Sequence, residues 1–84
     1  MRGKHRKTME ALYADPVRGT IMWRDVGALL LALGCAIEEG SGSRVRFTLN
    51  GLTLIVHRPH PQPESRRYVL RNIREFLQRA GVKP

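Results

Sequence analysis

The 84-residue sequence has a single cysteine, Cys35, and no hydrophobic run long enough to cross a membrane. One cysteine cannot form a disulfide within the chain, and it leaves no Cys-x-x-Cys spacing for a zinc site. A membrane span needs about 18 apolar residues in succession, whereas the longest apolar stretch here is 28–33. The basic N-terminus is followed by Thr8, Glu10 and Asp15, where a signal peptide would have its apolar segment. We therefore expect a cytoplasmic protein with no membrane partner.

Acidic residues are also scarce, with seven Asp and Glu against fifteen Lys and Arg and a formal net charge of +8. Such a charge on a small surface produces a potential that attracts polyanions. Twelve of the fifteen basic residues are arginine, whose planar guanidinium grips phosphate with two hydrogen bonds and stacks on bases. The composition favours nucleic acid as the partner. A basic protein that docks an acidic protein is the alternative.

The chain is long enough for one hydrophobic core only. Apolar spacing and turn residues predict helices at 5–14, from about 23 to 33 and at 66–80, and strands at 35–39, 43–49 and 52–57. Ser65 is expected to cap the last helix and Gly81 to end it. This order predicts an α+β fold in which a three-stranded antiparallel sheet packs on two helices, α-β-β-β-α, preceded by an extra N-terminal helix. We expect 1–22 to form that helix and its connector, and 23–84 to form the main domain.

The two predicted hairpins fix which side chains face each other. Positions 50 and 51 read Asn-Gly, the pair most favoured in a two-residue hairpin turn. Residues whose numbers sum to 101 then lie opposite each other, so Arg44 faces His57. A three-residue turn at 40–42 would place Glu38 beside Arg44. Glu38, Arg44 and His57 would then form a row on the outer face of the sheet, either as a solvated ion pair with a neighbouring histidine or as a phosphodiester site.

The second interpretation has a chemical basis. Cleavage of RNA by its own 2′-hydroxyl needs a base at that hydroxyl, a cation at the phosphate oxygens and an acid at the leaving oxygen. Histidine suits the two proton transfers and arginine the electrostatic role. We therefore predict His57 and His60 as proton-transfer residues, with no metal or other cofactor. The predicted contacts to RNA phosphates are Ser43, Arg44, Arg46, Arg58, Arg67 and Arg71.

Three motifs follow one another along the predicted elements. They are Gly42-Ser43 at the start of the second strand, His60-Pro61 after the third, and Ile-Arg-Glu-Phe-Leu-Gln-Arg-Ala-Gly at 73–81. In this order they resemble the HicA toxin family. The resemblance covers about 23–82, and His60 matches the later histidine of the family. It implies a fold like a double-stranded-RNA-binding domain, metal-independent cleavage of mRNA, and neutralisation by a HicB antitoxin.

One position departs from the family pattern. HicA toxins read Gly-Ser-His at the start of the second strand, and that histidine is catalytic, whereas this sequence reads Gly42-Ser43-Arg44. His57, opposite Arg44 in the predicted hairpin, could bring an imidazole to about the same place from the neighbouring strand. We expect a HicA-like endoribonuclease toxin. The alternatives are an RNA-binding module that kept the fold without catalysis, and a basic interaction protein that docks an acidic partner.

Overall fold

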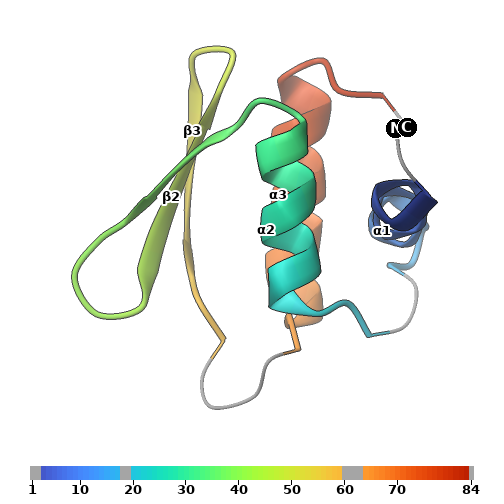
Figure 1. Cartoon of the computed structure of the whole chain (residues 1–84), viewed down its shortest axis with the longest axis horizontal. Coiled ribbons are helices and arrows are strands. Elements are labelled where there is room, and N and C mark those ends of the chain that lie inside the picture. Colours follow the sequence, from blue (N-terminus) through green and yellow to red (C-terminus); the bar gives the residue numbers. More distant parts are fainter. Residues whose placement is uncertain (1–2, 18–19, 60–63, 84) are drawn as a thin grey trace.

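The computed structural model describes residues 3–17, 20–59 and 64–83 and confirms the predicted α+β fold. Its elements are α1 (Gly3–Tyr13), α2 (Trp23–Ala32), β1 (Ala36–Glu39), β2 (Arg44–Leu49), β3 (Leu52–His57) and α3 (Arg67–Arg79). The strands form one antiparallel sheet in the order β1-β2-β3. All three helices lie on the same side of the sheet, with α2 and α3 between it and α1 (Figure 1). The other face of the sheet carries no described element.

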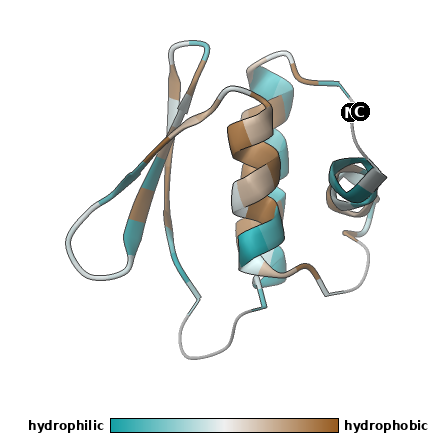
Figure 2. Cartoon of the chain, viewed as in Figure 1, coloured by the Kyte–Doolittle hydropathy of each residue, from teal (hydrophilic) through white to brown (hydrophobic). Residues whose placement is uncertain are grey.

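The core lies between the inner face of the sheet and the helices α2 and α3. Val45, Phe47 and Leu49 alternate along β2 and are buried, while their neighbours Arg44 and Arg46 are exposed. The apolar stripe predicted for α3 is buried throughout, at Val69, Leu70, Ile73, Phe76, Leu77 and Ala80. Hydrophobic residues also run along most of α2 after its hydrophilic first turn (Figure 2). One core therefore joins the sheet and both helices.

The N-terminal helix α1 is docked on this domain. Met9 and Leu12 are buried, as their spacing predicts. Tyr13 donates its hydroxyl hydrogen to the Val82 carbonyl at 3.0 Å. Arg74, which lies outside the apolar stripe of α3, is nevertheless half-buried and donates to the Ala14 carbonyl at 2.8 Å. Among the described helices, none combines the length and apolarity needed to cross a membrane.

The β2–β3 hairpin has the predicted register. Asn50 and Gly51 adopt positive φ angles of 51° and 80°, as a two-residue turn of this type requires. Arg44 pairs with His57 across the strands. The apolar pairs of the hairpin fall on the inner face, and they are Val45 with Val56, Phe47 with Leu54, and Leu49 with Leu52.

The predicted register of β1 against β2 is wrong by two residues. Glu38 lies opposite Arg46, not Arg44, so Glu38, Arg44 and His57 do not form one row. The three-residue turn is at 41–43, one residue later than expected, because the Gly40 N–H donates to the Arg44 carbonyl at 2.8 Å. Gly42, with a φ of 64°, occupies the left-handed position of this turn. Moving a turn by one residue shifts the pairing by two, which keeps every side chain on its expected face.

The start of α3 also differs from the prediction. Arg66 is the N-cap residue, and no side chain caps the helix. Ser65, the expected cap, instead donates its N–H to the Ile21 carbonyl at 2.9 Å, next to a bridge between Met22 and Glu64. This contact ties the chain that enters α3 to the segment that precedes α2. As predicted, α3 is followed by Gly81, which has a φ of 86°.

Candidate nucleic-acid interface

His57 is held by a hydrogen bond at the end of the β2–β3 hairpin. Its Nδ1 lies 3.1 Å from the hydroxyl of Ser43, the residue just before β2. The Arg58 N–H donates to the Ser43 carbonyl at 2.7 Å, so the ladder continues one pair beyond His57 and fixes Ser43 in place. The Nε2 atom of His57 has no hydrogen-bond partner within the described residues. The exposed imidazole is therefore oriented by one nitrogen and open at the other.

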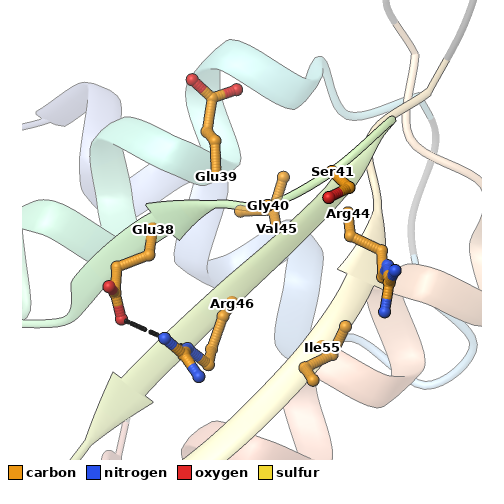
Figure 3. A pocket seen from close by; sticks show the side chains of 8 residues that line it. All are labelled: Glu38, Glu39, Gly40, Ser41, Arg44, Val45, Arg46 and Ile55. Atoms are coloured by element: carbon orange, nitrogen blue, oxygen red, sulfur yellow. Dashed lines mark hydrogen bonds and ion pairs between the residues drawn. The ribbon is translucent and has the colours of Figure 1, made fainter.

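The two arginines of β2 have different surroundings. Arg46 donates to one oxygen of Glu38 through Nε at 3.2 Å and Nη2 at 2.8 Å. No carboxylate pairs with Arg44 in the described ranges, and its strand partner is His57. Figure 3 shows Arg46 turned toward Glu38, while Arg44 extends toward the β3 side of the sheet. Arg44 therefore offers an uncompensated positive charge beside the imidazole, whereas the charge of Arg46 is already neutralised.

The depression drawn in Figure 3 has a volume of about 280 Å³ and lies over the outer face of the sheet. Arg44, Arg46 and Ile55 line it together with two acidic residues, Glu38 and Glu39. These carboxylates disfavour a polyanion at the β1 side. The part of this depression that suits phosphate is therefore the β3 side, where Arg44 lies.

A second pocket, of about 290 Å³, lies between the end of β3 and the start of α3. It is lined by His57, Arg58, Pro59, Ser65, Arg66, Tyr68 and Val69. Arg58 also forms an ion pair with Glu39, while Arg66 has no ion-pair partner in the part of the chain that the structure describes. The first turn of a helix carries a partial positive charge, which adds to that of Arg66. His57 thus borders an electropositive pocket.

The other predicted site residues are not gathered here. Arg67 and Arg71 are exposed on the stripe of α3 that also carries Arg74, whose guanidinium donates to the Ala14 carbonyl just after α1. Neither of the two lines the pocket that contains His57. His60 lies outside the described residues. The predicted roles of all these residues in binding or catalysis stay predictions.

Five residues of the pocket are absent from the predicted site, and two of them, Arg66 and Tyr68, have side chains suited to contact RNA. Arg66 stands in the same basic run as Arg67 and differs only in lying at the N-cap, which the pattern does not reveal. Tyr68 does carry a signal, because it falls outside the apolar stripe that begins at Val69. An aromatic residue that the core does not need, next to arginines at a helix start, is a candidate for ligand contact.

Cys35, the single cysteine, lies outside this interface. Burial raises the pKa of the Cys35 thiol above its ordinary value, so the thiol stays protonated at neutral pH and packs as a small apolar group. In 3–17, 20–59 and 64–83, no three His, Cys, Asp or Glu residues are grouped so that they could hold a metal ion.

Comparison with known proteins identifies the class. The family model described as HicA toxin of bacterial toxin-antitoxin matches residues 23–82. No curated protein and no solved structure matches the chain. A compact basic α+β domain with this match is a toxin of a bacterial toxin-antitoxin system. The chain belongs to the HicA toxin family. At this coarse level the family implies an endoribonuclease class, RNA targets and an antitoxin partner. The likeness to a double-stranded-RNA-binding domain stays a prediction.

Proposed function

We propose that the chain is a HicA-type toxin that binds mRNA and cleaves it without a metal, and that a HicB-like antitoxin neutralises it. The observation that carries this proposal is the juxtaposition of Arg44 and His57 across the β2–β3 hairpin, with His57 oriented by Ser43. A cation and an oriented imidazole at one end of a hairpin supply two of the three groups that phosphodiester cleavage needs, the cation at the phosphate and the base at the 2′-hydroxyl.

The reaction that suits these groups is attack by the RNA 2′-oxygen on the adjacent phosphorus. The new O2′–P bond forms, the P–O5′ bond breaks, and the products are a 2′,3′-cyclic phosphate and a free 5′-hydroxyl. His57 Nε2 takes the proton from the 2′-hydroxyl, while Ser43 holds Nδ1 and thereby sets the ring orientation. Arg44 stabilises the negative charge that builds on the non-bridging oxygens. We assign protonation of the leaving 5′-oxygen to His60.

A second candidate function is an RNA-binding module without catalysis. The observation that favours it is Arg44 itself, because this position carries the catalytic histidine in the family that the sequence resembles. In that case Arg44 and His57 contact phosphate and transfer no proton. The two candidates share RNA as the partner, so cleavage is the measurement that separates them.

The deciding experiment incubates the purified chain with an mRNA and compares wild type with His57→Ala and Thr53→Ala. Thr53 is the matched control, because it is exposed on the same face of β3, has no titratable group, and lines neither the depression over the sheet nor the pocket that contains His57. Loss of a general base lowers the rate by about 10²- to 10⁴-fold. We expect that loss for His57→Ala and wild-type cleavage for Thr53→Ala, with unchanged circular dichroism for both.

The products and the phenotype give two further readouts. Cleavage products should end in a 2′,3′-cyclic phosphate, and expression of wild type should arrest growth. If wild type binds RNA but does not cleave it at any pH, the binding-module candidate holds. A His57→Ala variant that cleaves as fast as wild type would remove His57 from the mechanism.

A further inference from the structure

The two tyrosines of the chain have opposite environments. Tyr13 is half-buried, its hydroxyl bonds to the Val82 carbonyl, and burial raises its pKa above the ordinary value. Tyr68 is 52% exposed, and its hydroxyl has no hydrogen-bond partner within the described residues. Among the exposed large hydrophobic side chains of those residues, Tyr68 is the aromatic one. Packing therefore explains Tyr13 but does not explain Tyr68.

Tyr68 lines the same pocket as His57, Arg58 and Arg66. It reaches this pocket from the first turn of α3, which stands across from the end of β3. Arg58 is paired with Glu39, whereas Arg66 has no ion-pair partner within the described residues. An aromatic ring beside an unpaired guanidinium group presents both contacts that a nucleotide uses, a surface for the base and donors for the phosphate. At about 290 Å³ the pocket is at the lower end of small-ligand sites, which suits one nucleotide.

We propose that this pocket binds one unpaired nucleotide, with its base stacked on Tyr68 and its phosphate held by Arg66, and so selects single-stranded RNA. A base in a duplex is already stacked and paired, so its face is not available to a tyrosine ring. A single strand can turn a base out and place its phosphate next to His57. The inference rests on RNA as the ligand of the proposed function and adds the strandedness of the substrate.

The test measures binding separately from cleavage. The probe is a labelled 2′-O-methyl RNA decamer, which lacks the attacking hydroxyl, used as a single strand and as a duplex with its complement. Fluorescence anisotropy gives the affinity of wild type, Tyr68→Ala, Tyr68→Phe and Leu31→Ala. Leu31 is the matched control, because it is 62% exposed on α2 and lies outside the pocket.

We expect Tyr68→Ala to weaken binding of the single strand by about tenfold, within the range measured for one stacked base. Tyr68→Phe keeps the ring and should stay within about twofold of wild type, as should Leu31→Ala. Binding of the duplex should not change in any of the three. The slope of log affinity against log salt should be the same in Tyr68→Ala as in wild type, because no charge is removed. In Arg66→Ala it should fall by about 0.7, the value for one phosphate contact on a single strand.

Several results would overturn this inference. One is unchanged single-strand affinity in Tyr68→Ala, and another is an equal loss for the single strand and the duplex. A loss in Tyr68→Phe as large as in Tyr68→Ala would assign the effect to the hydroxyl and not to stacking. If wild type binds and cleaves RNA in any of these cases, the proposed function stands and the stacking inference alone fails. If wild type binds neither probe, both fail.

Discussion

Two rows of side chains cross the outer face of the sheet, two residues apart, and they differ in whether a carboxylate pairs with their arginine. In the Arg46 row, made of Glu38, Arg46 and Ile55, the guanidinium makes two hydrogen bonds to a carboxylate. In the Arg44 row, made of Arg44 and His57, no carboxylate faces the guanidinium within the described residues. The two arginines look equivalent in the sequence, yet only one is free to bind an anion.

This difference arises from strand register. Glu38 can neutralise one arginine of β2, and the position of the β1–β2 turn decides which. With the turn at 41–43, the carboxylate pairs with Arg46 and leaves Arg44 beside His57. A turn one residue earlier would place the carboxylate beside Arg44, in the row that contains His57, and would oppose phosphate binding there. A count of basic residues therefore overstates the charge that RNA can use.

We expect the largest effect from a substitution in the β2–β3 turn, because this turn pairs Arg44 with His57. Asn50 has a φ of 51°, and its Nδ2 donates to the Ala80 carbonyl at 2.7 Å, at the end of α3. Asn50→Val places a β-branched residue in the left-handed region and removes that hydrogen bond. We expect a loss of about 3 kcal/mol in the free energy of unfolding, from backbone strain and the unpaired carbonyl together. Urea denaturation followed by Trp23 fluorescence measures it.

Two control variants separate the two causes. Asn50→Gly keeps the positive φ and loses only the hydrogen bond, so we expect about 1 kcal/mol. Gly42→Ala strains the turn of the other hairpin, where φ is 64°, and should also cost about 1 kcal/mol. If Asn50→Gly is as unstable as Asn50→Val, backbone conformation is not what fixes the β2–β3 hairpin.

The contrast between the two hairpins also shows which strand registers the sequence alone can predict. An Asn-Gly pair between alternating strands has one favoured geometry, so the register of β2 against β3 follows from it. The stretch Gly-Ser-Gly-Ser at 40–43 allows a three-residue turn in two positions. These positions shift the pairing by two residues, and a pattern of period two is the same in both. Alternation therefore predicts the faces of Glu38 and Arg46 but not their pairing.

Tertiary contacts form the pocket between the end of β3 and the start of α3. Local patterns predict the end of β3 and, to within a residue, the start of α3. They do not predict that Met22 pairs with Glu64, or that Ser65 is bonded to Ile21. These contacts, not a capping serine, position Arg66 and Tyr68 opposite His57. The helix repeat alone determines the apolar stripe of α3, so the sequence predicts that stripe. Which residues face the start of α3 across the pocket depends on how the chain returns from β3.

The next prediction compares the two arginines directly. In Arg44→Gln the slope of log affinity against log salt for a single-stranded 2′-O-methyl RNA should fall by about 0.7, one phosphate contact. The affinity itself should fall by about tenfold, as for loss of one charged hydrogen bond. Arg46→Gln should change the slope by less than half as much, since Glu38 already compensates its charge. Equal slopes for the two variants would show that the Glu38 ion pair does not withhold Arg46 from RNA.

The smallest expected effect comes from Glu38→Gln, which leaves Arg46 as a second arginine without a carboxylate partner. The ion pair is exposed, with 52% of the Arg46 side chain and 64% of the Glu38 side chain accessible, so its loss should cost less than about 1 kcal/mol of stability. The affinity for single-stranded RNA should rise two- to threefold, and the salt slope should steepen by up to about 0.7 as Arg46 gains a phosphate. Glu10→Gln removes the same charge from the exposed side of α1, which lies away from the sheet. If it raises the affinity and the slope as much as Glu38→Gln does, the gain reflects net charge, and the difference between the two rows has no part in RNA binding.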